Sequence, residues 1–301
     1  MWKTGLLRAN QERCYLTKMT ELNITKNLIT SRQNATVKRV CSLLEKKARR
    51  AEGLFRFDGI KLLFEAAKKG LKIEYAVLSE KIDKRNLQRV EELIDGGFLD
   101  EKSIVFVTEQ VFEKMSDESS PEGIITVAKI PVEMHGCVVC ADEYFIDGRK
   151  RILIVESLRD PGNMGTVIRS SFALGIDRLI ISDDCADLYN PKTVRAAMGA
   201  LFSLEIDIVP RADLPKLILR LRSLGRAVYA TALRDDALKI GEIDMKIGDA
   251  FVIGNEGHGL SDDVIDASTK TAISPMTEGS ESLNAAAAAA VCIWETVRKG
   301  R

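Results

Sequence analysis

This 301-residue chain has no excess of positive or negative charge and no long hydrophobic run. Lys+Arg and Asp+Glu number 44 each, so the formal net charge is zero. Whole-chain charge therefore predicts neither a nucleic-acid partner nor a membrane partner, and any such preference must be local. The residues from Met1 to Met19 carry several charges and no signal-peptide core, and no later run approaches a membrane span. We therefore expect a cytoplasmic protein.

Several catalytic and cofactor motifs are also absent. The dinucleotide fingerprint G-x-G-x-x-G and the phosphate loop G-x-x-x-x-G-K-[ST] are not matched, and no Cys/His pair or Ser/His/Asp order indicates a hydrolase. The six cysteines, without a secretory signal, favour reduced thiols over a disulfide framework. His135, Cys137 and Cys140 have the H-x-C-x-x-C spacing, but a closed zinc site needs a fourth ligand, so we expect no metal there.

The length allows two domains, each with its own core. Pro131, Gly136 and Gly148 interrupt the regular alternation of expected strands and helices. We predict a disordered extension at residues 1–22, a small α/β domain at 23–129, a linker at 130–150 and a second α/β domain at 151–301.

The first domain begins with a basic helical pattern between Ser31 and Glu52. Val37, Val40, Leu43 and Leu44 lie on one face at helical spacing. Seven cations lie in or next to this pattern: Arg32, Lys38, Arg39, Lys46, Lys47, Arg49 and Arg50. Such a run is either a solvated helix face or a contact to a phosphate backbone, which clustered Lys and Arg bind by counterion release. Both interpretations stay open.

Further along the first domain, strands and helices alternate. We predict strands at Ile73–Leu78, Ser103–Thr108 and Ile125–Ala128, and helices at Ile60–Lys69, in the charged segment that ends at Ile94, and near Gln110–Met115.

The second domain alternates more regularly and predicts a parallel sheet with helices on both faces. The expected strands are Arg151–Glu156, Arg178–Ser182, Ala227–Thr231, Ala250–Ile253 and Thr271–Ser274. The expected helices are Gly165–Leu174, a helix from the Asn190-Pro191 start to Ala200, Leu214–Leu224 and Leu283–Val297.

Three polar, glycine-containing loops follow strands of this sheet, at residues 156–165, 254–260 and 274–284. Ligands of parallel sheets bind beyond the carboxyl ends of the strands, so the three loops are expected to form one site. Gly254, Gly257 and Gly259 allow positive φ and the close approach of a flat ligand to the backbone.

On these loops the chain resembles the SpoU (TrmH-type) RNA 2′-O-ribose methyltransferases of the SPOUT superfamily. The residues that carry the resemblance are Asp160–Arg169, Asn190–Ala200, Ile253–Leu260, and Pro275-Met276 with Glu281-Ser282-Leu283-Asn284. The part of the chain with Ser31-Arg32-Gln33-Asn34 and Ser120-Pro121-Glu122-Gly123 is similar to the family's RNA-binding domain.

The resemblance implies methyl transfer from S-adenosylmethionine to a ribose 2′-hydroxyl of structured RNA, rRNA in preference to tRNA, by a homodimer with a deep trefoil knot. The cofactor contacts that it implies are Thr231, Gly254, Glu256, Ser274, Met276 and Leu283. The catalytic residues that it implies are Arg169, Asn163, Glu281, Ser282 and Asn284. An arginine is a poor general base because its pKa exceeds roughly 12, so Arg169 either orients the substrate or acts as a base in altered surroundings. Asn284 is also a candidate helix cap.

Two other classes remain as alternatives: an RNA-binding protein of the same fold without methyl transfer, and a nucleotide-dependent oxidoreductase. Asn163, Arg169, Glu256 and Asn284 argue against the first, and the missing dinucleotide fingerprint argues against the second. One departure from the family pattern is the alanine run from Ala285 to Ala290, which favours helix and permits close packing.

Overall fold

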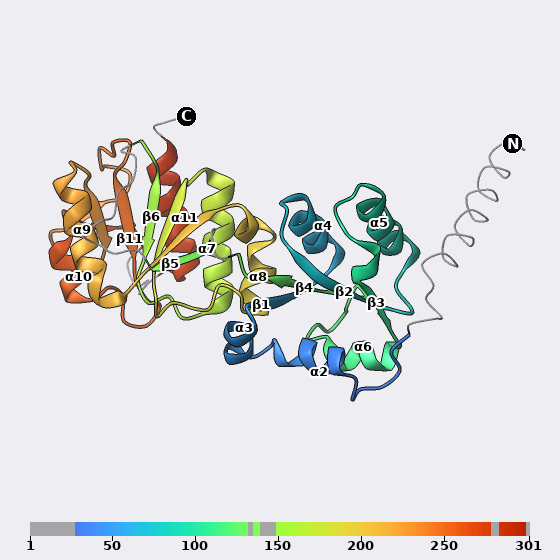
Figure 1. Ribbon diagram of the computed structural model, residues 1–301. Coiled ribbons are helices and arrows are strands. Elements are labelled where there is room, and N and C mark those ends of the chain that lie inside the picture. Colours follow the sequence, from blue (N-terminus) through green and yellow to red (C-terminus); the bar gives the residue numbers. More distant parts are fainter. Residues whose placement is uncertain (1–27, 132–134, 139–148, 278–282, 299–301) are drawn as a thin grey trace, which may run out of the picture. The chain divides into compact units, whose positions relative to one another are not determined.

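The computed structural model describes residues 28–131, 135–138, 149–277 and 283–298 (Figure 1). The chain divides into two compact units, with the division between Lys129 and Ile130. Within the described ranges, none of the helices combines the length and the apolar character needed to cross a lipid bilayer.

The first unit is a four-stranded sheet in the order β1-β4-β2-β3, with β4 antiparallel to both neighbours and β2 parallel to β3. Separate apolar clusters join α2 and α6 to the sheet, and α4 and α5 to the sheet. The elements are α2 (Ala35–Ser42), α3 (Lys46–Glu52), β1 (Leu54–Asp58), α4 (Ile60–Lys68), β2 (Ile73–Ser79), α5 (Lys84–Asp95), β3 (Ile104–Val107), α6 (Glu109–Met115) and β4 (Ile124–Lys129).

Two features of the first unit differ from the sequence expectation. The basic helical pattern forms two helices, and the Arg49 guanidinium donates to the carbonyls of Leu43 and Leu44 at the turn between them. Strand β1 was not predicted, because Arg56 stands in its centre. The Arg56 side chain is fully buried and pairs with Asp58 at 2.8 Å, which permits a charged residue inside the strand.

The second unit is an eight-stranded sheet in the order β10-β12-β9-β11-β6-β7-β8-β5, and every pairing in it is parallel. This confirms the predicted parallel sheet, while the trefoil knot stays a prediction. The strands are β5 (His135–Val138), β6 (Ile152–Val155), β7 (Arg178–Ser182), β8 (Glu205–Val209), β9 (Val228–Thr231), β10 (Leu238–Lys239), β11 (Ala250–Ile253) and β12 (Lys270–Ile273). The helices are α7 (Pro161–Leu174), α8 (Pro191–Ala197), α9 (Leu214–Ser223), α10 (Asp262–Ala267) and α11 (Ala285–Arg298).

Helices cover both faces of this sheet, as predicted (Figure 1). An apolar cluster joins α9 and α10 to one face. Helix α7 packs against α8 and α11, and α11 also contacts β11. The short elements β5, β8, β10 and α10 were not predicted. Residues 135–138 fall within the expected linker and pair with β8, and Cys140 of the H-x-C-x-x-C motif lies outside the described residues.

The strand order reverses between β6 and β11, and this position determines where a ligand can bind. From β6 the chain continues outward through β7 and β8, whereas β11, β9 and β12 lie on the other side of β6. In parallel sheets such a switch point opens a crevice at the carboxyl ends of the strands.

The helix after β6 begins four residues earlier than predicted. Asp160 accepts a hydrogen bond from the backbone N–H of Asn163 at 2.8 Å, and Pro161 occupies the first turn of α7. Residues 161–165 are therefore helical and not part of a loop. Helix α8 ends earlier than predicted, because Met198 and Gly199 both adopt left-handed backbone conformations.

Candidate functional site

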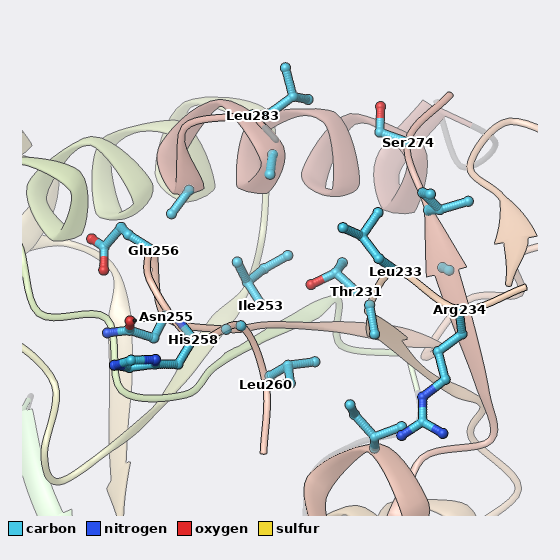
Figure 2. Close-up of a pocket in the computed structure, with 18 of the residues that line it drawn as sticks. Thr231, Leu233, Arg234, Ile253, Asn255, Glu256, His258, Leu260, Ser274 and Leu283 are labelled. Carbon is cyan, nitrogen blue, oxygen red and sulfur yellow. Dashed lines mark hydrogen bonds between the residues drawn. The ribbon is translucent and has the colours of Figure 1, made fainter. Parts of the chain in front are cut away.

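A cavity of about 540 Å³, called here the first cavity, opens at the carboxyl ends of β9, β11 and β12 and at the start of α11 (Figure 2). It is lined by all six residues for which the family resemblance implies a cofactor contact: Thr231, Gly254, Glu256, Ser274, Met276 and Leu283. Its lining also includes residues that were not predicted, among them Leu233, Arg234, Leu260, Asp262 and Ile265. Most of these residues follow the ends of strands β9 and β11. Their position after predicted strands is the feature of the sequence that could have identified them.

The loop after β11 closes on itself. Asn255 and Gly259 exchange two backbone hydrogen bonds of 2.9 and 3.0 Å, and the Asn255 side chain accepts from the backbone of Gly257 and His258. A Cβ on Gly254 would lie 2.3 Å from the carbonyl carbon of Gly259, and Gly259 has a φ of +70°. The loop itself therefore requires glycine at positions 254 and 259, and Gly259 adopts the positive φ that the sequence predicted.

A chain of polar side chains joins the three expected loops at the rim of the first cavity. The Asn284 amide donates to Asn163 Oδ1 at 3.1 Å, and Asn163 Nδ2 donates to Glu256 Oε1 at 3.0 Å. Asn284 Oδ1 also accepts from the backbone N–H groups of Ala286 and Ala287, so Asn284 caps α11 and contacts Asn163 at the same time.

The start of α7 is fixed from a second direction by Lys192, which was not among the predicted site residues. Its ammonium lies 3.0 Å from Asp160 Oδ2. The hydrogen bond from the Asn163 backbone, and then that from Lys192, lower the pKa of Asp160 below its usual value. Gly165 lets α8 approach closely, because a Cβ there would lie 2.5 Å from the Thr193 carbonyl oxygen. The α7–α8 contact thereby holds Asn163 in position.

The other predicted catalytic residues are not joined to this chain of side chains. Arg169 is exposed on α7 and makes no hydrogen bond or ion pair with the residues that the structure describes. It follows Asn163 by six residues, which places it roughly 120° around the helix axis. Glu281 and Ser282 lie outside the described residues.

In the first unit, most of the cations predicted to contact RNA are accessible. Arg32, Lys38, Lys46, Lys47 and Arg50 are exposed, and Arg39 is partly exposed and pairs with Glu52 at 2.5 Å. Arg49 is only 2% exposed, because its guanidinium closes the turn between α2 and α3. This burial argues against a direct contact between Arg49 and RNA.

The lining of the first cavity suits a ligand with a flat apolar part and a positive charge. Ile253, Leu260 and Leu283 supply apolar surface, and Glu256 supplies a carboxylate, while Asp262 lies 3.5 Å from the Arg234 guanidinium in the same lining. The volume is typical of pockets for small organic ligands. S-adenosylmethionine, which combines a heterocycle with a sulfonium ion, fits this lining.

Two family models match separate parts of the chain. Residues 150–294 match the SpoU rRNA Methylase family, and residues 34–126 match the MRM3-like substrate binding domain.

Individual proteins resemble the chain over nearly its whole length. The 23S rRNA (guanosine(2553)-2′-O)-methyltransferase RlmP of Bacillus subtilis is 30% identical over 267 residues, which cover 88% of this chain and 97% of that protein. The mitochondrial rRNA methyltransferase 3A of Danio rerio is 26% identical over 306 residues, covering 87% of this chain and 68% of that protein. The crystal structure of an AdoMet-bound rRNA methyltransferase from Sinorhizobium meliloti matches with a TM-score of 0.75 at 25% identity, covering 90% of this chain and 97% of that one.

Proposed function

The chain belongs to the SpoU rRNA methylase family, and from this premise we propose that it transfers a methyl group from S-adenosylmethionine to a ribose 2′-hydroxyl of structured RNA, ribosomal RNA in preference to tRNA. The similar B. subtilis enzyme is named for 2′-O-methylation of a guanosine in 23S rRNA, and the similar S. meliloti structure contains AdoMet. Residues 23–129 would bind the RNA and residues 151–301 would hold the cofactor, joined by a linker at 130–150. A cytoplasmic location belongs to this proposal and is tested by cell fractionation.

The observation that carries the proposal is the junction of Asn163, Glu256 and Asn284 at the rim of the first cavity. S-adenosylmethionine supplies an activated methyl group when bound. The cavity residues Thr231, Gly254, Ser274, Met276 and Leu283 would hold it. A reactive group in this cavity would then lie beside side chains from the first turn of α7, the loop after β11 and the start of α11.

The chain's own residues would orient the ribose and accept its proton. Glu256 Oε1 accepts from the Asn163 amide, and from the backbone N–H of Asp160 at 3.4 Å, whereas Oε2 makes no hydrogen bond with the described residues. Oε2 is thus available to a ribose hydroxyl. A guanidinium carries donors only, so we assign Arg169 to holding a phosphate of the RNA and not to removing a proton.

A homodimer is the second part of the proposal, and an apolar outward face supports it. Helices α7 and α11 both begin at the carboxyl edge of a parallel sheet, pack together and run in the same direction. Phe172, Val291 and Trp294 on these helices are 47%, 38% and 49% exposed. Arg169 lies one turn before Phe172 on the same side of α7. A second copy covering this face would remove the apolar side chains from water and would place Arg169 at the interface.

The experiment that tests the function maps ribose methylation in RNA. Ribosomal RNA purified from cells that lack the gene is incubated with the purified protein and S-adenosylmethionine. We expect methylation of one ribose position, and loss of at least tenfold in turnover for Arg169→Ala. RNA binding without any methylated product would support the RNA-binding alternative. Unaltered turnover of Arg169→Ala would remove this residue from its assigned role.

A further inference from the structure

A second cavity, of about 590 Å³, adjoins the first. Asn255, His258, Gly259 and Leu260 line both cavities, so the loop after β11 is their common wall. The remaining lining residues are Glu156, Ser157, Arg159, Arg211 and Ser261. The sequence motifs assigned no ligand to this second cavity.

The charges deepest in the second cavity already have partners in the chain. Glu156 is 2% exposed, accepts two hydrogen bonds from Ser261 and lies 2.6 Å from Arg211 Nε. Arg211 also makes two hydrogen bonds, of 3.0 and 2.8 Å, with the Asp263 carboxylate. Because Arg211 is paired with two carboxylates, these groups offer no free positive charge and do not favour a phosphate as the ligand.

One wall of the second cavity contains a strained residue. Ser157 has a φ of +54°, which is unusual for a residue other than glycine. Three hydrogen bonds of 2.7 to 2.8 Å hold it there: its N–H donates to Ser182, its hydroxyl to Asp184, and its carbonyl accepts from the Asn255 side chain. Strain of this kind persists where the surroundings over-determine it and is frequent at functional sites.

The strained turn is followed by an exposed arginine. Arg159 is 62% exposed and donates to Asp184 Oδ2 at 2.8 Å. Partial burial acts to raise the pKa of Asp184, but hydrogen bonds from Ser182 and Ser157 and the charge of Arg159 outweigh it and lower the pKa. The ionised carboxylate keeps the guanidinium at the cavity while leaving most of its surface accessible.

His258 supplies a second flat group from the common wall. Figure 2 shows its ring beside the Asn255 amide, pointing away from Thr231 and Ser274. The residue is exposed, and its ring makes no hydrogen bond with the residues that the structure describes. The second cavity therefore presents a guanidinium and an imidazole, both of which stack on nucleic-acid bases.

We propose that the second cavity binds an unpaired base of the substrate RNA, held by stacking on the Arg159 guanidinium and the His258 imidazole. This rests on the proposed function. Because the two cavities share a wall, a base in the second cavity leads its ribose toward the rim of the first, where Glu256 and Asn163 lie. Stacking tolerates different bases, so this contact positions the nucleotide without identifying it.

The test measures RNA affinity separately from methyl transfer. Full-length protein carrying Arg159→Ala or His258→Ala is titrated with ribosomal RNA from cells that lack the gene, in the presence of S-adenosylhomocysteine, which cannot donate a methyl group. We expect each variant to lose about tenfold in RNA affinity, since stacking on one base is worth roughly this factor or more. For Arg159→Ala, at a residue that lines only the second cavity, affinity for S-adenosylmethionine, measured by calorimetry, stays within about twofold of the unmodified protein.

Conservative variants and a control separate stacking from charge and from misfolding. His258→Phe keeps a flat ring and retains RNA affinity, while Arg159→Lys keeps the charge but loses the plane and weakens binding. Arg220→Ala, at an exposed arginine of α9 outside both cavities, keeps RNA affinity. Unchanged RNA affinity in both alanine variants overturns the proposal, as does an equal loss of S-adenosylmethionine affinity in Arg159→Ala. Failure of the unmodified protein to methylate this RNA would instead contradict the proposed function, because the affinity measurements do not depend on turnover.

Discussion

At the scale of single residues, Gly254 shows how closely the loop after β11 is packed. An added Cβ would lie 2.3 to 2.5 Å from the backbone of Gly259 and Leu260. We expect Gly254→Ala to lower the free energy of unfolding by about 1–3 kcal/mol, the usual cost of overpacking, and to weaken S-adenosylmethionine binding because the loop must shift. Denaturant unfolding and calorimetry measure the two effects.

Gly257→Ala is the matched control for this prediction. A Cβ at position 257 would lie 3.5 Å from Asn255 Oδ1, which is ordinary contact, and the φ of Gly257 is not in the left-handed region. Its free energy of unfolding should therefore change by less than about 0.5 kcal/mol. Equal destabilisation by the two substitutions would show that the close approach at Gly254 is not what restricts the loop.

Asn284 caps α11 through its side-chain oxygen and contacts Asn163 through its side-chain nitrogen. Two substitutions separate these two roles. Asn284→Asp keeps an oxygen for the helix cap but loses the donor to Asn163, so stability should persist while methyl transfer falls at least tenfold. Asn284→Ala should lose activity and also about 1 kcal/mol of stability. Thermal unfolding and initial rates on the same samples measure both. If Asn284→Asp kept full methyl-transfer activity, Asn284 would act only as the N-terminal cap of α11.

At the scale of helices and strands, the pair of Arg211 and Asp263 joins the segment after β8 to the start of α10. The hydrogen bond from Arg211, and then that from Ser261, lower the pKa of Asp263 to about 2. A lowered carboxylate pKa contributes stability above the unfolded-state value of about 3.9, and this contribution disappears as the pH falls toward 2. We therefore expect unmodified protein to lose more stability than Asp263→Asn between pH 5 and pH 2.5.

Urea unfolding of both proteins at several pH values measures this difference. The carboxylate is about half exposed, so the difference should be less than about 1 kcal/mol. Parallel pH curves for the two proteins would mean that Asp263 does not contribute in this way.

The sequence predicted most elements of both units, including short strands such as β7 and β11, which are continuous apolar runs. It did not predict β8 and α10, whose apolar residues are interrupted by two and three acidic residues. The early start of α7 was visible in Asp160 and Pro161, but the glycines that follow favoured a loop. The motifs predicted which residues gather at the first cavity. The sequence did not predict the burial of Arg49. The carbonyls of Leu43 and Leu44 that accept its hydrogen bonds come together only when the chain has folded.

At the scale of the whole molecule, the apolar face of α7 and α11 determines the expected assembly. Trp294→Glu puts a carboxylate into the proposed interface, so we expect the dimer to dissociate and methyl transfer to fall. Analytical ultracentrifugation measures the oligomeric state. Leu219→Glu is the control, because Leu219 is equally exposed, at 51%, on α9, which packs with a different set of side chains. A Trp294→Glu variant that remains dimeric would contradict the proposed interface.

The strand order of the second unit also decides when the site can exist. Ile152 of β6 pairs with Ala250 of β11. The hydrogen bond between Asn163 and Asn284 also joins residues that are far apart in the sequence. Pairing between such distant segments is slow to form because the long loop between them must close first. On the ribosome, strands β6 to β8 emerge before their central neighbour has been synthesised. The side of β6 that pairs with β11 therefore stays unpaired from the synthesis of residue 155 until that of residue 250, and the rim contact forms only after residue 284.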